Sequence, residues 1–389
     1  MTELRWHTAG ESHGPELVAI VEGIPAGMRL VAEQIDRELA RRQRGYGRGP
    51  RMKIERDAAH VVAGVRNGET LGGPIALRIP NRDHEHWVGR MGAEPFASAP
   101  DALTRPRPGH ADLAGGLKYN RHDLRDILER ASARETAARV AVGAIAKQLL
   151  SHLGVEIASR VVSIGAVVSG TAAQTATLDD LHRASASELA CEDPTAEDAM
   201  KAAIRQAAHT GDTLGGVFEV VGFNVPPGLG SHVSWNAKLD GRLGQALMCI
   251  HAVKGVEIGL GFEAARMRGS EVHDAIGYDA HQQAFTRPTN RAGGLEGGIT
   301  NGMPVVCRAA MKPIATLRKP LASVDVVSKE PFDAAFERSD VCAVPAAAVI
   351  GEAMVAIVLA QAAREKFGGD SMGEMLANFE AYIRQLRAY

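Results

Sequence analysis

The 389-residue sequence has little cysteine, few aromatic side chains and almost no net charge, and each shortage excludes a class of protein. Its 4 cysteines lie far apart and form no Cys-x-x-Cys pair, so neither a cysteine-based zinc site nor a disulfide framework is expected. The formal net charge of −2 provides no global positive field for nucleic acid or an anionic membrane. Aromatic residues make up 4% of the chain, which leaves few stacking platforms for bases.

Long hydrophobic runs and several common catalytic motifs are also missing. No apolar run reaches the roughly 18 residues of a membrane span, and residues 345–363 are interrupted by Gly351, Glu352 and Gln361. The N-terminus lacks the apolar stretch of a signal peptide, so we expect a cytoplasmic protein that contacts no membrane and needs no metal. Without a P-loop, a GxGxxG or a GxSxG motif, a nucleotide kinase, a conventional Rossmann dehydrogenase and a serine hydrolase are disfavoured.

Glycine is in excess, and the apolar residues follow a mixed pattern. There are 42 glycines in 389 residues, about 11% against an average of roughly 7%, which suggests close backbone approaches and positive φ angles. Helices and strands are not strictly alternating, which favours one α+β domain over residues 1–389. Periodicity predicts helices at 33–44, 133–153, 178–189, 196–210, 238–252, 345–367 and after Ser371, and strands at 53–65, 74–80, 155–168, 215–225, 254–260 and 303–311.

Basic residues gather between positions 37 and 56, where Gly45, Gly47 and Gly49 separate several arginines. Glycine allows guanidinium groups and backbone amides to converge on one phosphate or carboxylate. A solvated helix end, an RGG-like nucleic-acid segment and ordinary surface charge are the competing explanations.

A second segment, Arg105-Pro106-Arg107-Pro108-Gly109-His110, presents cations on a backbone stiffened by proline. An imidazole beside guanidinium groups suits protonation of a leaving phosphate. A loop histidine that is hydrogen-bonded to Asp112 explains the spacing equally well.

A third segment combines two arginines with a predicted helix start. Ser132 and Glu135 have the spacing of a capping box, and Arg130 and Arg134 flank it. The free amides and positive potential of a helix N-terminus favour an anion there. A capped helix with two exposed arginines is the structural alternative.

Four further segments have weaker signals. His13 lies in a glycine-flanked turn, residues 293–298 form a glycine-rich loop, residues 312–316 offer a lysine and a threonine, and Asp340 precedes the last long apolar helix. A structural turn, a β-bulge or a helix cap accounts for each one singly. Together, the residues indicate an enzyme that holds a multiply charged anion among arginines and uses histidines for proton transfer.

In their order along the chain, these segments resemble chorismate synthases. The matching motifs are GESHG at 10–14, RRQRGYGRGPRM at 41–52, RPGHAD at 107–112, RASARETAARVA at 130–141, GDTLGG at 211–216, VKGVEIG at 253–259, GGLEGG at 293–298, MKPIAT at 311–316 and RSDVCAVPAA at 338–347. The resemblance implies a β-α-β sandwich, in which antiparallel sheets enclose helices, assembled as a homotetramer. It also implies anti 1,4-elimination of phosphate from 5-enolpyruvylshikimate 3-phosphate to give chorismate, with reduced FMN required but no net redox change.

The resemblance also implies roles for individual residues. His13 acts near the reduced flavin, His110 protonates the departing phosphate, and Asp340 accepts a proton by way of flavin N5. Ser12 and Ser132 belong to a hydrogen-bond relay, Arg107 and Arg134 bind substrate anions, and Arg42 and Arg48 bind NADP or a substrate anion. The FMN set comprises Arg130, Ala131, Ser132, His251, Ala252, Gly297, Lys312, Pro313, Ile314, Ala315, Thr316 and Arg338, which is also in the anion-binding set.

Two alternatives remain beside this hypothesis. The arginine-glycine segment at 41–51 is typical of an RNA-binding protein, although Tyr46 is its one aromatic residue. A flavin reductase that oxidises NADPH is the other, with a shallow nucleotide site at Arg42 and Arg48. The sequence does not distinguish a chain that reduces its own flavin from one that depends on a separate flavin reductase. The glycine and arginine clusters together predict a tight, arginine-lined pocket for phosphorylated ligands.

Overall fold

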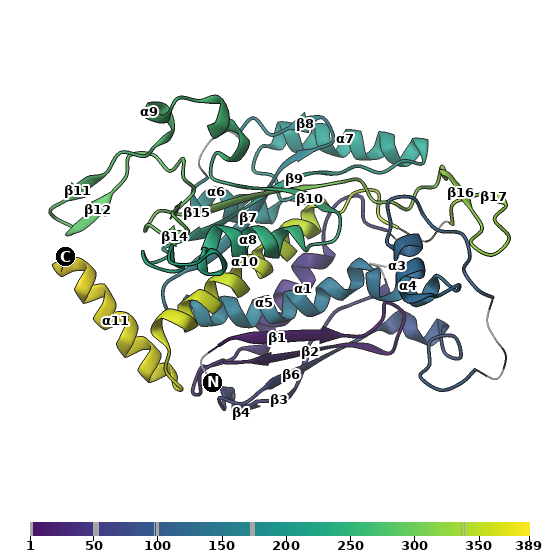
Figure 1. Cartoon of the computed structure of the whole chain (residues 1–389), viewed down its shortest axis with the longest axis horizontal. Helices are drawn as coiled ribbons and strands as arrows, with labels where there is room; N and C mark the ends of the chain where they lie inside the picture. Colours follow the sequence, from purple (N-terminus) through teal and green to yellow (C-terminus); the bar gives the residue numbers. More distant parts are fainter. Residues whose placement is uncertain are drawn as a thin grey trace.

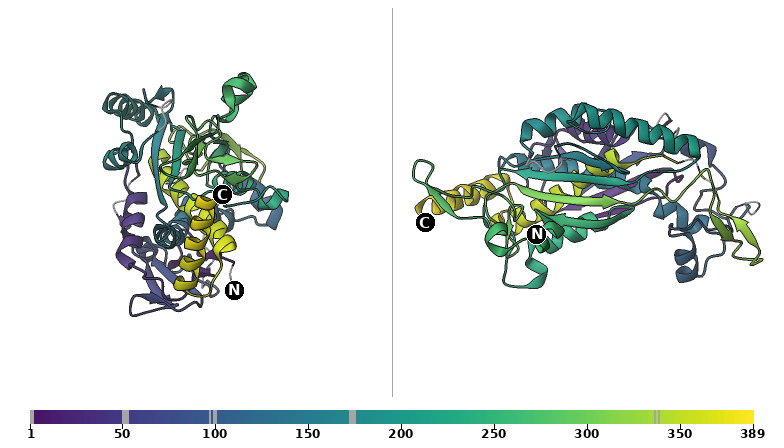
Figure 2. Two further views of the ribbon diagram at one scale, coloured as in Figure 1. Left: turned by 90° about the vertical axis from the view of Figure 1, so that its left-hand side faces the viewer. Right: turned by 90° about the horizontal axis from the view of Figure 1, so that it is seen from above.

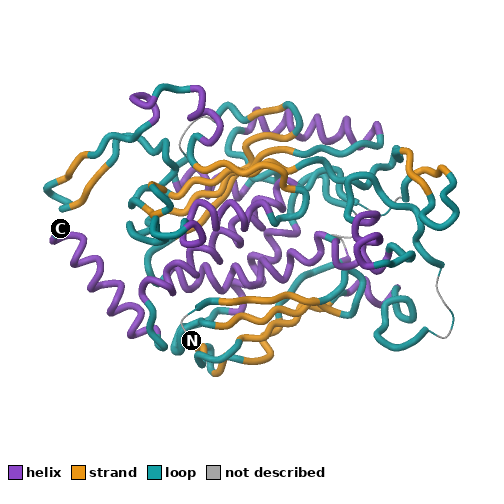
Figure 3. Tube along the Cα trace, in the orientation of Figure 1, coloured by secondary structure: helices purple, strands orange, loops and turns teal. Residues whose placement is uncertain are grey.

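Two antiparallel sheets enclose a layer of helices (Figure 1 and Figure 3). The computed structural model describes residues 3–49, 54–96, 98, 101–171, 176–335, 337 and 339–389. The first sheet has the order β1-β2-β6-β3, with β1 Arg5–Ala9, β2 Glu16–Glu22, β6 Ile75–Pro80 and β3 His60–Ala63. The second has the order β10-β15-β9-β7-β8, with β10 Val253–Ile258, β15 Val305–Met311, β9 Gly216–Phe223, β7 Glu156–Ile164 and β8 Val167–Val168.

The two sheets differ in how they are covered. Along β2, Leu17, Ala19 and Val21 are buried and alternate with more exposed residues, as expected of a strand with one face on the core. β7 is buried along almost its whole length because helices pack on both of its faces. Figure 2 shows that α6 (Leu178–Ala186) and α7 (Pro194–Thr210) cover its outer side.

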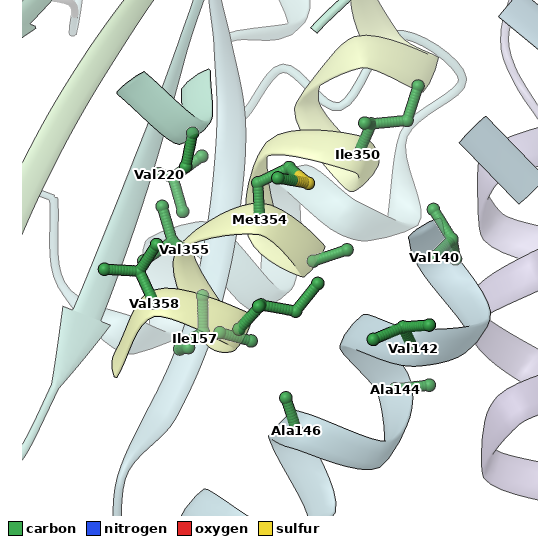
Figure 4. Packing of buried hydrophobic residues seen from close by; sticks show 14 of the residues in the cluster. Val140, Val142, Ala144, Ala146, Ile157, Val220, Ile350, Met354, Val355 and Val358 are labelled. Atoms are coloured by element: carbon green, nitrogen blue, oxygen red, sulfur yellow. The ribbon is translucent and has the colours of Figure 1, made fainter. Parts of the chain in front are cut away.

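The enclosed layer contains α1 (Ala32–Gln43), α5 (Thr136–Ser151), α8 (Leu239–Met248) and α10 (Val344–Phe367). α10 is apolar on all sides and packs against α5, β7 and β9, so that Met354 and Val355 lie among the side chains of these elements (Figure 4). Within the described ranges, α10 is the one helix long and apolar enough to span a membrane. Its most apolar window is 94% buried inside the protein, so it is the core helix.

Smaller elements surround this frame. α3 (Asp112–Tyr119) and α4 (Arg125–Ala131) lie at one end of the molecule, and α11 (Met372–Ala388) lies at the other (Figure 1). Two-stranded hairpins are formed by β4 Val65–Arg66 with β5 Glu69–Thr70, β11 Gly277–Asp279 with β12 Ala284–Thr286, β13 Leu295–Glu296 with β14 Ile299–Thr300, and β16 Ala322–Val324 with β17 Pro331–Asp333. Short helices are η1 Arg82–His86, η2 Ala133–Glu135, η3 Trp235–Ala237, η4 Gly261–Arg266 and α9 Gly269–Val272.

The α+β class and the sandwich of sheets around helices are confirmed. The long helices were predicted to within a few residues at most ends, and Ser371 and Glu374 form a capping box at the start of α11. The predicted strand at 53–65 is wrong over most of its length, because strand within the described part of this range covers only His60–Ala63 and Val65, where β4 begins. The segment 155–168 is two strands, because Gly165 at φ +56° turns β7 into β8.

The predicted helix at 133–153 begins later than expected. The side chain of Ser132 accepts a hydrogen bond from the backbone nitrogen of Arg134, which caps the short 3₁₀ helix η2. The carboxylate of Glu135 instead accepts from Thr8 and Arg139, so the expected capping box is absent and α5 starts at Thr136. The change of helix type turns the backbone between Ser132 and Thr136 and brings this segment to the functional site described next.

Candidate active site

A cavity of about 480 Å³ lies where several helices of the central layer begin or end. It adjoins the C-terminal end of α1 and the N-terminal ends of α5 and α10, and helix N-termini contribute positive potential. Its lining includes five cationic side chains and two carboxylates. The cations are Arg42, Arg48, Arg107, Arg134 and Lys312, and the carboxylates are Glu337 and Asp340.

Arg42 and Arg134 are held together by one carboxylate. Asp57 accepts from Arg134 Nη1 at 2.6 Å and lies 3.4 Å from Arg42 Nη1. Arg42 Nε also donates to Thr136 Oγ1 at 2.9 Å, and Arg134 Nε donates to Asn81 Oδ1 at 2.8 Å. Burial lowers the pKa of Arg42 to about 10, partly opposed by Asp57. Both guanidinium groups are therefore fixed in position before any ligand binds.

Arg107 and His110 share a second carboxylate, that of Asp112. Arg107 Nε donates to Asp112 Oδ2 at 2.8 Å, and His110 Nδ1 lies 2.5 Å from Oδ1. Burial raises the pKa of Asp112, but hydrogen bonds from His110 and Arg107 outweigh it and hold the pKa well below its usual range. The structural alternative for His110, a hydrogen bond to Asp112, is therefore observed. It is compatible with a role in the cavity, because His110 also lines it.

His13 occupies a buried niche at the cavity wall. Its Nδ1 lies 2.9 Å from Glu129 Oε1, and its ring stacks on Trp87 with centroids 4.2 Å apart. The guanidinium of Arg125 lies over the Trp87 ring, 4.8 Å from its centroid. The preceding residue, Ser12, donates a hydrogen bond from its backbone nitrogen to the carbonyl of Glu129 on α4 at 3.0 Å.

Asp340 is oriented by residues of the arginine-glycine segment. Its Oδ1 accepts from the backbone nitrogen of Gly49 at 2.5 Å, and its Oδ2 lies 3.3 Å from Arg48 Nε. A β-carbon at Gly49 would lie 2.8 Å from the carbonyl oxygen of Ser339, so only glycine fits this approach. The glycine spacing therefore places a carboxylate and a cation at one edge of the cavity.

The remaining wall is formed by residues 251–252 and 311–316. Arg107 Nη1 donates to Thr316 Oγ1 at 3.0 Å, and the backbone nitrogen of Lys312 donates to the Ala252 carbonyl at 2.9 Å. Ala252 has φ +65°, a conformation that alanine rarely adopts and that is typical of functional sites. Burial lowers the pKa of His251 to about 4, so its imidazole is neutral near pH 7.

Most of the predicted site residues do meet here. The cavity is lined by Ser12, His13, Arg42, Arg48, Arg107, His110, Ala131, Ser132, Arg134, His251, Ala252, Lys312, Ile314, Ala315, Thr316 and Asp340. Arg130 does not line it, because its guanidinium donates to the carbonyls of Thr8 and Gly10. Gly297, in the β13–β14 turn, and Pro313 do not line it either. Arg338 lies outside the described residues.

The structure also adds residues that the sequence did not single out, namely Asp57, Trp87, Glu129 and Glu337. None of them stands within one of the cationic motifs, and no spacing rule marks them. The polar partners of arginines and histidines are set by tertiary contacts, so sequence alone had no signal for them.

Over its described residues, 41–49, the arginine-glycine segment does not have the features of an RNA-binding arm. Arg41 Nη2 lies 2.7 Å from the buried Glu352 Oε1, and Arg42 is 4% exposed. Arg48 pairs with Asp340. Because these cations are engaged inside the protein, they are unavailable as the exposed charges that such binding needs.

Comparisons with known proteins agree with the site. The family model described as "Chorismate synthase" matches residues 4–363. The chain is 59% identical to the chorismate synthase of Desulforudis audaxviator over 387 residues, covering 99% of this chain and 98% of that protein. It is 56% identical to that of Solibacter usitatus over 388 residues, covering 99% and 100%. A solved structure described as "Crystal Structure of Chorismate Synthase" has 47% sequence identity and a TM-score of 0.81, covering 100% of this chain and 99% of that one.

Proposed function

The chain belongs to the chorismate synthase family, and on that premise we propose that the cavity binds the substrate and cofactor of that reaction through the residues described above. Enzymes of this family are phosphate lyases of the shikimate pathway that use reduced FMN. The observation that carries the proposal is the convergence of three histidines, Asp340 and five cations on one cavity. The substrate carries a phosphate and two carboxylates, and a site with several fixed cations suits such a ligand.

The residues present fit FMN as the cofactor. Cavities of roughly 300–1,000 Å³ hold small ligands and cofactors, so a volume of about 480 Å³ is in range. Leu128, Ala131, Met311 and Ile314 supply apolar lining for a ring system. His251 Nδ1 is a buried polar atom with no hydrogen-bond partner among the described residues, which is consistent with a partner supplied by a ligand. We propose as FMN contacts the cavity-lining residues Ala131, Ser132, His251, Ala252, Lys312, Ile314, Ala315 and Thr316.

The phosphate of the substrate is assigned to the side of the cavity that holds Arg107 and His110. Arg107 contributes a guanidinium whose orientation is fixed by Asp112 and Thr316. His110 lies directly beside it, and a proton delivered from this ring neutralises charge on the leaving phosphate as the C–O bond breaks. Arg48 and Arg134 are proposed to bind the other anionic groups of the substrate.

Proton removal from substrate carbon is assigned to the opposite edge. We propose that Asp340 finally receives this proton, with its carboxylate aimed by Gly49 and Arg48. His13 and the hydroxyls of Ser12 and Ser132 are proposed to relay protons along the wall between the two edges. When bound, reduced FMN supplies electron density that eases cleavage of the allylic C–O bond and then recovers it, so that no net redox change occurs.

Several finer points are proposals of the same kind. Arg130, Gly297, Pro313 and Arg338 are proposed FMN contacts by resemblance alone, and Arg42 with Arg48 is a proposed site for NADP or a substrate anion. A cytoplasmic location, a single domain over residues 1–389 and a homotetramer are likewise proposed. Exposed apolar side chains on the β11–β12 hairpin, Tyr278 at 57% and Phe285 at 53%, support an assembly. NADPH is proposed as the reductant, used by this chain or by a separate flavin reductase.

The test is an anaerobic assay with purified protein, reduced FMN and 5-enolpyruvylshikimate 3-phosphate, in which phosphate release is measured. His110→Ala and Asp340→Ala should each slow turnover by about 10²-fold or more, the loss typical of a missing proton-transfer group. Near-normal turnover in both variants would reject their assigned roles. The same assay with NADPH and oxidised FMN in place of reduced FMN determines whether the chain reduces its own cofactor.

A further inference from the structure

We propose that Glu129 and Asp112 are positioning residues that hold His13 and His110 as Nδ1–H tautomers, so that each ring presents Nε2 for proton transfer. The inference rests on the proposed roles of the two histidines. It adds a pair of carboxylates that the nine motifs did not assign to the chemistry.

The two histidines are held in the same way although they lie on unrelated loops. Glu129 is 2% exposed and Asp112 is fully buried. Glu129 accepts from the backbone nitrogen of His13 at 2.8 Å and lies 2.9 and 3.0 Å from its Nδ1. Asp112 accepts from the backbone nitrogen of Arg107 at 3.1 Å and lies 2.5 Å from His110 Nδ1. Each carboxylate thus fixes both the loop and the ring.

Hydrogen-bond chemistry gives the tautomers. An ionised carboxylate only accepts, so the ring nitrogen that faces it must carry the proton. Burial raises the pKa of Glu129, but hydrogen bonds from His13 more than compensate and lower it, which keeps this carboxylate ionised near pH 7. The pKa of Asp112 is lowered in the same way by His110 and Arg107.

Two neighbours of His110 compete for its Nδ1, and the acceptor Asp112 is closer than the donor Arg107. Arg107 Nη2 lies 3.0 Å from His110 Nδ1 and 3.4 Å from Nε2. A guanidinium only donates, so a hydrogen bond from Arg107 Nη2 to Nδ1 would require a lone pair on Nδ1. The contact between Nδ1 and Asp112 Oδ1 is shorter, 2.5 Å, and Nη2 has its own acceptor in Asp112 Oδ1 at 3.1 Å, so we assign the proton to Nδ1. Nε2 then carries the lone pair that takes up a proton, and the resulting imidazolium donates from Nε2 to the phosphate oxygen expected beside this cation.

The neighbours of His13 restrict its ring further. Trp87 packs on the ring face, and Asp83 Oδ2 lies 3.8 Å from Nε2, beyond direct hydrogen-bond distance. His84 Nδ1 donates to the backbone carbonyl of His13 at 2.9 Å, and Arg125 donates to Glu129 Oε1 at 3.1 Å. The ring therefore cannot rotate without losing its stacking contact and its hydrogen bond to Glu129.

The experiment reads the tautomers directly in protein without cofactor. Histidine-selective ¹⁵N labelling and solid-state NMR at pH 8 distinguish Nδ1–H from Nε2–H rings, and the signals of His13 and His110 are assigned from their loss in the His13→Gln and His110→Gln variants. We expect both rings as Nδ1–H in the parent protein. A parent spectrum with either ring as Nε2–H would overturn the proposal for that ring.

Variants then identify the carboxylate that acts on each ring. Glu129→Met removes the acceptor at similar length and should leave His13 in a mixture of tautomers while His110 stays Nδ1–H. Asp112→Leu, which removes the acceptor, should disturb His110 and leave His13 unchanged, so each variant is the control for the other. Glu129→Gln keeps an acceptor oxygen and should keep the His13 tautomer. An unchanged His13 signal in Glu129→Met, or equal loss in Gln and Met variants, would refute the role of Glu129.

Kinetics separate this role from a general loss of structure. In Glu129→Met, kcat should fall roughly 10²-fold, as when an oriented acid or base is lost, while KM stays close to the parent value. Glu219→Gln is the control for a buried carboxylate, since Glu219 is 2% exposed and pairs with Arg160 and Arg308 away from the cavity. It should lower thermal stability and leave both tautomers unchanged. If His13→Ala and His110→Ala retain turnover, the proposed catalytic roles of the two histidines fail, whereas the tautomer result is independent of that outcome.

Discussion

The closest approach between the two central helices gives the sharpest test of how the core supports the site. Gly143 on α5 faces Ala353 on α10, and a β-carbon built on Gly143 would lie 2.3 Å from the Ala353 β-carbon and 2.5 Å from its α-carbon. Optimal carbon contacts are about 3.5–4.0 Å, so the clash is more than about 1 Å deep. Because one of the clashing atoms is backbone, a change of rotamer cannot relieve it, and the helices must separate.

The sign of the Gly143→Ala effect follows from two opposed contributions. Replacing glycine by alanine inside a helix stabilises it by about 1 kcal/mol. Overpacking a close-packed core costs about 1–3 kcal/mol, and a backbone clash lies at the upper end of that range. We therefore expect the free energy of unfolding to fall by about 2 kcal/mol. Turnover should fall as well, because Arg134 directly precedes α5 and the start of α10 adjoins the cavity.

The matched control is Gly244→Ala on α8. Gly244 is also inside a helix, but nothing lies within 4 Å of the position of its β-carbon. This variant should gain the propensity contribution alone, roughly 0.5–1 kcal/mol, with unchanged turnover. Urea unfolding followed by circular dichroism, at one protein concentration for all variants, measures the difference. A Gly143→Ala protein as stable as the parent, or stabilised as much as Gly244→Ala, would refute the reasoning.

Three further predictions concern charge and close approach. Burial lowers the pKa of His251 to about 4 from its ordinary 6.5. Between these two pH values the unfolded chain binds a proton at this residue and the folded chain does not, so the free energy of unfolding falls as the pH drops. His251→Asn should reduce the dependence of the unfolding free energy on pH by up to about 1.4 kcal/mol per pH unit, measured by urea titrations between pH 7 and 4. An unaltered pH dependence would contradict this. Gly49→Ala should displace Asp340 and reduce turnover by up to about 10²-fold in the phosphate-release assay. Gly73 has open space around it, so Gly73→Ala is the control and should keep its turnover. Equal activities of the two variants would exclude the steric argument. Glu352→Gln removes the fully buried carboxylate that pairs with Arg41 and Lys147, and it should cost about 3–5 kcal/mol in calorimetry. Glu365→Gln breaks a more exposed pair with Arg242 and should cost about 1 kcal/mol or less, and similar losses in the two variants would show that burial is unimportant.

The sequence predicted the long elements of this fold because their periodicity is strong. α1 shows buried Ile35 and Leu39 one turn apart, and α10 is bounded by Pro345 and Gly368. The first strands, β1 and β2, were not predicted, although β2 alternates regularly. α3 and α4 were also missed, since each is two turns or so of helix that tertiary contacts stabilise more than local propensity.

Much of the candidate site was within reach of the sequence, because the family motifs carry the residues that touch ligands. Most of the carboxylates that pair with these residues could not be predicted from the sequence. Asp57 comes from a segment without a motif, and Glu129 stands one residue before the motif at 130–141. Asp112 is the exception, because it stands close to His110 in the sequence and the spacing already indicated a hydrogen bond. Glu129 is far from His13 in the sequence, so its role is recognised only when the turn at His13 and α4 are seen together.

The carboxylates also change how the charge of the site should be understood. From the sequence, the arginines gather in motifs while the acids are distributed along predicted helices, which suggests a cavity of uncompensated positive charge. In the structure, carboxylates outside the long helices pair with these arginines: Asp57 with Arg42 and Arg134, Asp112 with Arg107, and Asp340 with Arg48. Unpaired guanidinium groups at this depth would carry a large desolvation cost.

The arginine–carboxylate pairs affect ligand binding mainly because they fix the orientation of the guanidinium groups. Each guanidinium uses some of its donors on an internal carboxylate and retains others for a ligand, since arginine has five N–H donors in a fixed plane. Its orientation is fixed before the ligand arrives, so little side-chain entropy is lost on binding. The carboxylate of Asp112 holds both Arg107 and His110, which keeps a binding cation and a proton donor at a fixed position relative to each other. Anion binding and proton transfer at this edge of the cavity therefore depend on the same buried carboxylate.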